Sequence, residues 1–223
     1  MRRLLRFFTL LVLVALLGCG IYGWIGYRDG LRASVELAPQ ADALIAAGQG
    51  GGALGPGRQA MLLAVEDPAF FTHVGFDLTT PGGGITTITQ SLAKRQGFDE
   101  FIPGYRKLRQ TTYAIGLERG LTKPQILALF LDSVSMGRGP DGDWITGLFP
   151  ASLAHFDATP DAIPEDDFIA LVAVMIAPRD LALGEADAVL QTRIARIKRL
   201  LEGACEPLGN SDVWLEGCAG AES

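Results

Sequence analysis

The sequence predicts a mainly α-helical body joined to one N-terminal transmembrane helix. Three observations lead to this prediction. Residues 7–27 carry no charged side chain, apolar residues recur at helical spacing in several later segments, and the alternation typical of strands is scarce. With 223 residues, the chain is long enough for this helix and one domain of roughly 150 to 190 residues with its own core.

The uncharged N-terminal segment has the length of a membrane span. A helix over residues 7–27 would be about 31 Å long, close to a hydrocarbon core of ~30 Å. Three arginines precede the span, whereas Arg28 and Asp29 together add no net charge after it. This bias predicts that residues 1–6 are cytoplasmic and that the body is exported. The alternatives are a cleaved signal peptide and a lipidation site at Cys19 in "LLGCG".

Composition narrows the function classes. A net charge of −6 argues against nucleic-acid binding, because no basic surface large enough to neutralise many phosphates is evident. Two histidines and three cysteines offer no constellation for a structural zinc site. Cys205 and Cys218 lie near the C-terminus in "CEPLGNSDVWLEGC". In an exported domain they can close a small loop as a disulfide, and two free thiols are the alternative.

Residues 28–57 are expected to connect the membrane span to the folded domain. Their first part favours a juxtamembrane helix or stalk, and the glycine-rich stretch "GQGGGALGPGR" favours a flexible link. Next, "RQAMLLAVE" predicts a short apolar helix that ends near Glu66. Asp67 suits the N-cap, and Pro68 the first position, of a following helix in "PAFFTHVG".

Glu66 is the first candidate catalytic residue. It lies at the predicted joint between two helices, among apolar neighbours, where a carboxylate can face a cleft. A cleft of low dielectric constant disfavours the ionised form and raises the pKa, which suits a proton acceptor that works near neutral pH. An ordinary acid at a helix end is the alternative explanation of this stretch.

A turn rich in hydroxyl groups follows in "TTPGGGITTITQSLAKRQGF". Thr86, Thr87 and Thr89 lie near the N-terminus of a predicted helix that carries Lys94 and Arg95. Backbone N–H groups and hydroxyls at such a helix start can bind an anion or a sugar. Threonine caps that bind no ligand are the alternative.

The rest of the chain predicts further helices. "GYRKLRQTTYAIGLERGLTKPQILALFLDSV" favours two helices divided at Gly120, with Thr122 as the cap of the second. A loop is expected at 137–143, followed by an apolar segment, "WITGLFPASLAHF". The stretch "PEDDFIALVAVMIAP" predicts a buried helix, and "EADAVLQTRIARIKRLLEG" an amphipathic helix with a basic face.

Taken in order, these segments resemble the peptidoglycan glycosyltransferases of family 51, which include monofunctional transglycosylases and the transglycosylase domain of penicillin-binding proteins. The similarity covers about residues 58–200, which leaves 201–223 as a C-terminal tail. The family's first motif, E-D-x-x-F-x-x-H-x-G-x-D, is present in full. Its members here are Glu66, Asp67, Phe70, His73, Gly75 and Asp77.

Two further motifs support the resemblance. The second, G-x-S-T-I-T-Q-Q-L-x-K-N, appears as "GITTITQSLAKR", and the third, R-K-x-x-E, appears as "RKLRQ". The residues that match the family pattern in these motifs are Gly84, Thr87, Ile88, Thr89, Gln90, Leu92, Lys94, Arg106 and Lys107.

The resemblance implies a lysozyme-like domain that polymerises lipid II. Members of the family join a polyprenyl-pyrophosphate-linked glycan to the 4-hydroxyl of the next lipid-linked disaccharide, with inversion at the anomeric carbon. Glu66 would act as the general base. Lys94, Arg106 and Lys107 would stabilise the leaving pyrophosphate together with a divalent cation, Mg²⁺ or Mn²⁺. The remaining candidates for substrate binding are Asp67, His73, Thr86, Thr87, Thr89 and Gln90, and no residue is assigned to a metal.

The resemblance also implies a location and partners. The domain would face the periplasm from a single-pass anchor in a bacterial inner membrane, where lipid II and the growing glycan are both membrane-bound. Other proteins of cell-wall synthesis, the process that determines cell shape, are expected partners. No penicillin-binding module is expected in this sequence.

The sequence departs from the family pattern at several positions. The family's second catalytic glutamate is Gln110 here, so a carboxylate that would assist the leaving group or its metal is absent. Removing such a group typically lowers the rate by a factor of about 10²–10³. The segment between Asp77 and Gly84 lacks a helix that members usually carry. The other departures are Thr86, Ser91, Arg95 and Asp132.

Three functions therefore remain open. The first is an active but divergent glycosyltransferase. The second is a catalytically degenerate protein that binds a lipid-linked precursor or a cell-wall partner, and the residue that discriminates it from the first is Gln110. The third is a hydrolase with a lysozyme-like fold, which would need a second positioned carboxylate; Asp67 and Asp77 are the nearest in sequence.

Overall fold

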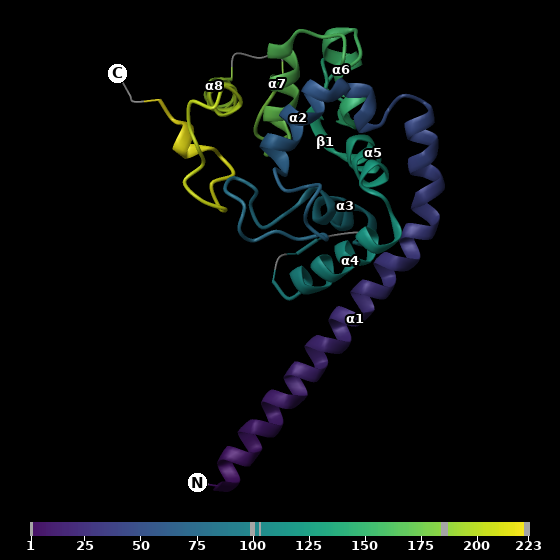
Figure 1. The fold of residues 1–223 in the computed structure, drawn as a ribbon, viewed down its shortest axis with the longest axis vertical. Coiled ribbons are helices and arrows are strands. Elements are labelled where there is room, and N and C mark those ends of the chain that lie inside the picture. Colours follow the sequence, from purple (N-terminus) through teal and green to yellow (C-terminus); the bar gives the residue numbers. More distant parts are fainter. Residues whose placement is uncertain (1, 99–100, 103, 184–186, 221–223) are drawn as a thin grey trace.

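The computed structural model describes residues 2–98, 101–102, 104–183 and 187–220 and shows a mainly helical chain, as predicted (Figure 1). Its elements in order are α1 (Arg2–Ala46), the 3₁₀ helix η1 (Gly51–Leu54), α2 (Gly55–Glu66), α3 (Ile88–Gly97), α4 (Arg106–Gly120), α5 (Lys123–Ser133), the strands β1 (Ser135–Arg138) and β2 (Trp144–Thr146), α6 (Leu148–Phe156), α7 (Glu165–Val174), α8 (Ala188–Leu201) and the 3₁₀ helix η2 (Glu216–Cys218).

The first helix is both the candidate membrane span and a wall of the folded domain. In its N-terminal part apolar side chains are exposed on all sides, and it is the one helix in the described part of the chain that is long and apolar enough to cross a membrane. Of the two predicted forms of the C-terminal part, a juxtamembrane helix or a stalk, the helix is present, and it packs on the domain. It continues the same helix and buries Gly30, Ser34, Leu37 and Ala41 against the domain. The reason is its small residues, which let other helices approach closely.

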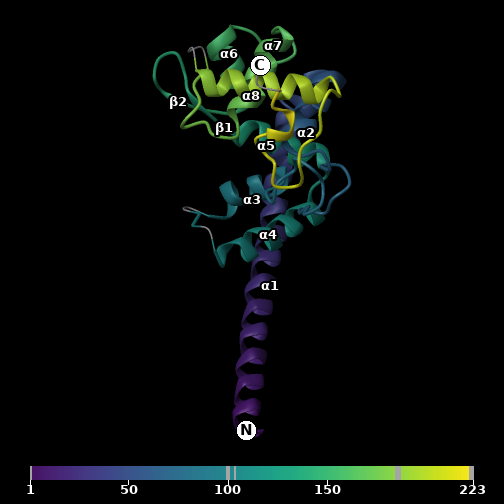
Figure 2. The same ribbon diagram turned by 90° about the vertical axis from the view of Figure 1, so that its left-hand side faces the viewer.

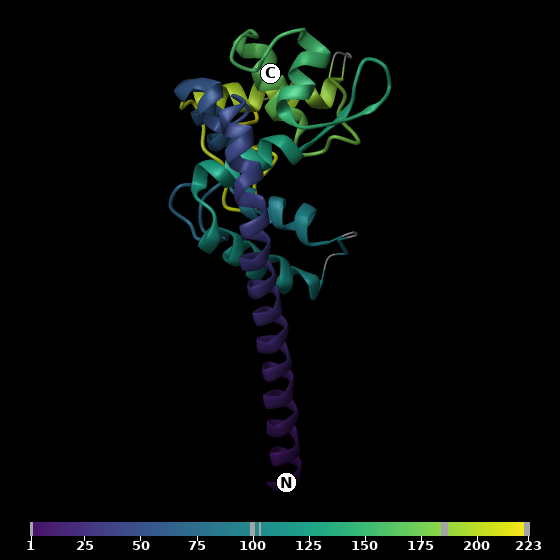
Figure 3. The same ribbon diagram turned by 90° about the vertical axis from the view of Figure 1, so that its right-hand side faces the viewer.

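The closest partner of α1 is α4, which lies alongside it in Figures 1 and 3. At Gly30 a side chain would collide with the backbone carbonyl of Tyr113. The same contact region contains an ion pair between Arg109 and Asp29 at 2.8 Å. Glycines at a helix contact let two backbones approach, as they also do between membrane-spanning helices. Arg109, which lies in the basic first turn of α4, therefore points toward α1.

The glycine-rich stretch after α1 is ordered and packed, whereas the sequence favoured a flexible link. It forms η1, and Leu54 at its end is only 2% exposed. Gly51 lies against the side chain of Leu127 on α5, so that a larger residue would not fit there. Glycine thus serves close packing here rather than flexibility, and the domain begins before residue 58.

Two short strands were missed. β1 and β2 form an antiparallel hairpin, seen beside α8 in Figure 2, with Arg138 opposite Trp144. The segment between them is the predicted loop at 137–143, which is therefore shorter than expected. β1 has four residues and β2 has three, which is too few to show an alternating pattern. β1 also contains Gly137, whose φ is 88°.

The helix predicted after Pro68 does not form. Residues 68–72 make turns, and the chain runs irregularly as far as the start of α3. Asp67 does not cap its own segment, because its carboxylate accepts the backbone N–H of Ile88 instead. A distant contact therefore outcompetes the local cap that the sequence suggested.

The other helix predictions are confirmed. Thr122 caps α5 in a reciprocal capping box with Gln125, α4 ends at Gly120, and α7 is buried along the apolar run. In α8, Asp187 is the N-cap, while residues 185–186 of the predicted helix lie outside the described residues. The two C-terminal cysteines are joined as a disulfide with Cα atoms 5.2 Å apart, and Cys19 is free and exposed.

We expect Gly30→Ala to lower the melting temperature in detergent by several degrees. The added methyl group would meet the Tyr113 carbonyl, and overpacking of this kind costs about 1–3 kcal/mol, or about 2–4 °C per kcal/mol for a chain of this size. Gly20→Ala is the matched control on the same helix, because nothing lies within 4 Å of the added carbon. Equal melting temperatures for the two variants would contradict the close packing of α1 on α4.

Candidate active site

Glu66 ends α2 and lines two adjacent cavities. The larger, of about 670 Å³, is bounded by α3, the junction of α5 with β1, the hairpin and the segment after α7. The smaller, of about 300 Å³, is bounded by the Gly83–Thr86 segment together with Ile176, Arg193 and Val213. Since Glu66 lines both cavities, it faces a cleft on either side and is not an ordinary solvated acid at a helix end.

Burial raises the pKa of Glu66 from 4.5 to about 7, because the carboxylate loses hydration. Arg193 opposes this rise, the neighbouring Asp67 adds to it, and Arg95 opposes it. Part of the residue still reaches solvent through the cavities. A carboxyl group with this pKa is about half ionised at neutral pH and can both accept and release a proton there.

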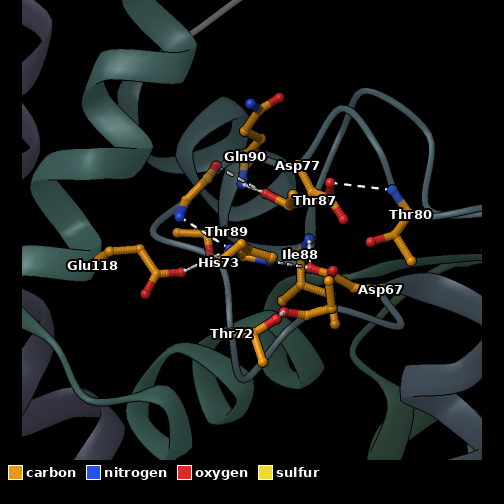
Figure 4. Close-up of polar contacts among 12 residues, drawn as sticks. Asp67, Thr72, His73, Asp77, Thr80, Thr87, Ile88, Thr89, Gln90 and Glu118 are labelled. Atoms are coloured by element: carbon orange, nitrogen blue, oxygen red, sulfur yellow. Dashed lines mark hydrogen bonds and ion pairs between the residues drawn. The ribbon is translucent and has the colours of Figure 1, made fainter. Parts of the chain in front are cut away.

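Asp67 is held inside the protein by a network that Figure 4 shows. It is 2% exposed, and one of its carboxylate oxygens lies 2.9 Å from His73 Nε2 and 2.9 Å from the backbone nitrogen of Ile88. The backbone N–H of Gly75 donates to His73 Nδ1 at 3.0 Å, so the imidazole proton is on Nε2 and is donated to Asp67. This network ties the end of α2 to the start of α3.

A second acid extends the network to two more helices. Glu118 on α4 accepts hydrogen bonds from Thr89 at 2.5 Å and from Lys123 on α5 at 2.7 Å. Lys123 also donates to the backbone oxygen of His73 at 2.9 Å. In Figure 4 the Glu118 and Thr89 side chains point toward one another beside His73. Three elements and the loop before α3 therefore meet at one buried polar centre.

The predicted threonine-rich helix start is present, and its hydroxyls have different surroundings. Thr87 caps α3 by accepting the Gln90 N–H at 3.1 Å, and its hydroxyl donates to the backbone oxygen of Gly75. Thr86, by contrast, is exposed and lines the smaller cavity. Among these threonines Thr86 is the one whose side chain faces the cleft, while Thr87 and Thr89 hold the helix start in place.

Three basic candidates lie on the side of α3 and α4 near the cleft. Lys107 donates to Thr86 at 3.1 Å and to the side chain of Gln90 at 2.6 Å. Burial, followed by the charge of Lys94, lowers the pKa of Lys107 to about 8. Lys94 is exposed and lines the larger cavity, and Arg106 is half-buried at the first turn of α4.

Gln110 does not line either of the two Glu66 cavities. It is 1% exposed, its amide nitrogen donates to the backbone oxygen of Gln90 at 2.8 Å, and its amide oxygen is buried without a partner. A carboxylate in this place would face the Gln90 carbonyl, so a neutral amide fits the local geometry better. The predicted catalytic position is thus placed behind the wall of the cleft.

The cleft also contains residues that the sequence did not single out as functional. Arg95 donates to Ser133 and Ser91 and stacks 5.2 Å from the Phe130 ring, and one of its terminal nitrogens is buried without a partner. Arg193 on α8 is 2% exposed. It occupies a core position between Leu190 and Ile197, and a charge on an apolar helix stripe was the signal that would have identified it.

A divalent cation would find few protein ligands in the described part of the cleft. Among the described residues no group of three or more His, Cys, Asp or Glu side chains could hold a metal ion. The family's second glutamate is the buried amide Gln110, and Asp132 is exposed and does not line the cleft. No step below is therefore derived through a divalent cation.

A mainly helical domain with a desolvated carboxylate between basic side chains has the features of an acid–base enzyme. Comparison with known proteins identifies the class more closely. The family model described as Transglycosylase matches residues 53–202, so the chain belongs to the transglycosylase family. This match begins within η1 and covers every element from α2 to α8.

The curated relatives are similar at modest identity. The biosynthetic peptidoglycan transglycosylase of Ectopseudomonas mendocina (strain ymp) is 28% identical over 150 residues, which cover 62% of this chain and 60% of the relative. That of Thiobacillus denitrificans (strain ATCC 25259 / T1) is 25% identical over 160 residues, which cover 66% of each chain. Penicillin-binding protein 1F of Bacillus subtilis (strain 168) is 28% identical over 129 residues, 52% of this chain and 17% of the relative. The chain therefore spans about a fifth of the penicillin-binding relatives. These relatives support a glycosyltransferase enzyme.

We expect Asp67→Ala to destabilise the domain by about 2–4 kcal/mol. The substitution leaves the Ile88 N–H and the His73 Nε2–H buried without an acceptor, and each such loss costs about 1–3 kcal/mol. Denaturant unfolding followed by circular dichroism measures the effect. Asp161→Ala, at an exposed position, is the control and should change stability by less than about 0.5 kcal/mol. A similar small change in both variants would show that the Asp67 network is not structural.

Glu66→Gln should stabilise the protein at pH 8 and leave it almost unchanged at pH 4.5. The raised pKa means that the native state holds a proton which the unfolded state releases between about pH 4.5 and 7, so parental stability falls as the pH rises through this window. The gain at pH 8 is up to about 3 kcal/mol. Unfolding free energies at both pH values measure it, with Glu202→Gln at an exposed position as the control. Equal effects at the two pH values would contradict the desolvation of Glu66.

Proposed function

We propose that this chain is a membrane-anchored peptidoglycan glycosyltransferase that polymerises lipid II by inverting transfer, with Glu66 as the general base. The observation that carries the proposal is the position of Glu66 in the cleft, where burial raises its pKa to about 7. The family membership supplies the reaction class. The substrate and the role of this residue follow from the resemblance in the motifs and from the geometry of the cleft.

The proposed reaction needs one base for the acceptor hydroxyl and basic side chains for the leaving pyrophosphate. Glu66 takes the proton of the acceptor 4-hydroxyl, the oxygen attacks the anomeric carbon of the donor, and the bond from that carbon to the pyrophosphate oxygen breaks with its electron pair. The two cavities that meet at Glu66 provide room for a sugar on either side of the carboxylate. Lys94 and Arg95 line the larger one and would stabilise the departing pyrophosphate.

The assignment of the other predicted residues follows from their surroundings. Thr86 and Lys107 lie near the smaller cavity and would contact the substrate. Asp67, His73, Thr87, Thr89 and Gln90 would act by holding the loop and α3 in place, because their polar atoms bind one another and the backbone. The divalent cation at the pyrophosphate stays a prediction, and its ligands would have to come mainly from the substrate.

The proposed location is the outer face of a bacterial inner membrane. The N-terminal part of α1 fits a single-pass anchor, and both proposed reactants carry lipid tails that confine them to the bilayer surface. The Cys205–Cys218 disulfide supports an exported domain, since disulfides persist in oxidising compartments. Cell-wall synthesis proteins are proposed partners on the same basis of family membership.

The alternative function is a degenerate member that binds a lipid-linked precursor without turnover. The observation that favours it is Gln110, which replaces a family carboxylate with a buried amide. The desolvation of Glu66 argues against this alternative, because it lowers the stability of the fold and a protein that only binds would have no use for it. A hydrolase is favoured less, because Asp67 is enclosed in its network and does not line the cleft.

We expect the purified full chain in detergent or liposomes to convert lipid II into glycan strands, and Glu66→Gln to abolish the conversion. The rate should rise with pH, reach half of its maximum near pH 7 and level off about one pH unit higher, because the base works only when ionised. Gel analysis of labelled lipid II measures both results. Glu202→Gln, at an exposed position, is the matched control and should retain the parental rate.

The same assay distinguishes the other functions. An inactive parent that gains activity as Gln110→Glu, and binds lipid II in both forms, would indicate the degenerate member. Release of free disaccharide from preformed glycan would indicate a hydrolase. A parent that neither polymerises nor binds lipid II would contradict the proposal.

A further inference from the structure

The C-terminal loop closed by Cys205 and Cys218 lies beyond the family match, which ends at residue 202. We refer to residues 205–218 as the disulfide loop. In Figure 1 the yellow C-terminal chain descends from α8 toward the irregular segment between α2 and α3. That segment is the one that the sequence showed to be short, and it contains one wall of the smaller cavity, the residues 83–86.

The disulfide loop is hydrogen-bonded to this wall. The backbone N–H groups of Gly82 and Gly84 donate to the backbone oxygens of Gly209 and Asn210, at 3.0 and 2.8 Å. The Asn210 amide donates in return to the backbone oxygens of Thr80 and Gly84, at 3.0 and 3.2 Å. Four hydrogen bonds thus join the disulfide loop to the segment between α2 and α3, and each segment supplies backbone partners to the other.

The loop also reaches the cavity itself. Val213 lines the smaller cavity together with Glu66. Gly84 adopts a φ of 65°, and a carbon added to it would lie 2.6 Å from Val213 Cγ1, so the two residues are in close contact. Arg193, which lowers the pKa of Glu66 by its charge, donates to the backbone oxygen of Val213 at 2.8 Å. The disulfide loop therefore contacts both the wall of the cavity and a cation beside the carboxylate.

Several contacts hold the loop in this shape together with the disulfide, and Leu215 within it is buried. Asp212 accepts three backbone N–H groups, those of Leu208, Glu216 and Gly217, and Arg196 donates to the backbone oxygen of Trp214. Beyond these contacts the loop has one short 3₁₀ helix and no longer element. A covalent link across such a loop removes many of the conformations that the open chain would adopt.

We propose that the disulfide loop is a substrate-positioning element of the Glu66 site. It fixes residues 80–86 and supplies Val213 to the smaller cavity, and it does so only while Cys205 and Cys218 are joined. The ligand positioned there is a sugar of the lipid-linked substrate, a part of the inference that rests on the proposed function. In this chain the loop forms a wall of the smaller cavity, in place of the helix that is missing between Asp77 and Gly84.

The test compares the full chain with the double variant Cys205→Ser, Cys218→Ser, and with Cys19→Ser as the matched control. Cys19 is exposed on α1, far along the sequence from the cleft. In the double variant KM for lipid II should rise at least about fivefold while kcat changes less than about twofold, because the base is intact and substrate placement is lost. Cys19→Ser should match the parent. An unchanged KM in the double variant would overturn the proposal.

A second variant covers the case in which the double variant folds poorly. Asn210→Asp keeps the disulfide and the shape of the side chain but removes the two N–H donors to Thr80 and Gly84. In this variant KM for lipid II should rise, as it should in the double variant. A parental KM in a folded Asn210→Asp protein would show that the loop does not position the wall.

A readout without turnover separates this inference from the proposed function. In the Glu66→Gln background, the dissociation constant for lipid II should rise at least about fivefold when the disulfide is removed. Amide hydrogen exchange at Gly82 and Gly84 should become at least about tenfold faster at the same time. Unchanged exchange would overturn the inference whatever the activity. If the parent protein, with its disulfide intact, neither binds nor polymerises lipid II, the proposed function is overturned. The exchange rates of Gly82 and Gly84 would then decide by themselves whether the loop holds residues 80–86.

Discussion

The rest of the structure depends on one buried carboxylate, that of Asp67. It accepts the proton of His73 and the backbone N–H of Ile88, and this fastens the irregular segment between α2 and α3 at both ends. Residues 68–87 form neither helix nor strand, so these hydrogen bonds, together with those from the disulfide loop, hold their backbone in place. Glu118, shown in Figure 4, extends the same polar centre to α4, and its ion pair with Lys123 extends it to α5. A fully satisfied network of this kind fixes a single arrangement of its members.

The position of Glu66 is a direct consequence of that network. Because Asp67 is anchored inward, the preceding residue is left at the mouth of two cavities, with Arg95 and Arg193 close enough to act on its charge. Desolvation outweighs these two cations, so the pKa rises to about 7 rather than falling. The protein thus holds its acid in an unfavourable environment, which weakens the fold above neutral pH but gives a base suited to neutral conditions. The two adjacent carboxylates thus have different surroundings, because Asp67 is enclosed in its network and Glu66 lines the two cavities.

The long first helix contains both the candidate membrane span and a face that packs on the folded domain. The same α1 that presents a bare apolar surface at its N-terminal end packs against α4 and α5 at its C-terminal end (Figures 1 and 3). α4 begins with Arg106 and Lys107, so the basic wall near the cleft is carried by the helix that contacts the anchor. If α1 spans a bilayer, the cleft is held at a set distance and angle from the membrane surface, where lipid-linked reactants would lie.

The sequence by itself determined the mainly helical class and the helices with strong periodicity and caps, because local patterns of three to four residues carry that information. It made Glu66 a candidate through the motif over residues 66–77, whose meaning came from the resemblance to a family. It predicted a juxtamembrane helix or stalk and a flexible glycine-rich link over residues 28–57, whereas the structure packs both parts against the domain. It also named Gln110 as a catalytic candidate, and the structure buries this side chain. Tertiary packing alone decided that Arg193, Val213 and the hairpin residues Ser135 and Thr146 line the Glu66 cavities. The physical reason is that desolvation and ion contacts depend on which surfaces meet. Arg193 lies far from Glu66 in the chain, and no local spacing records that they are neighbours.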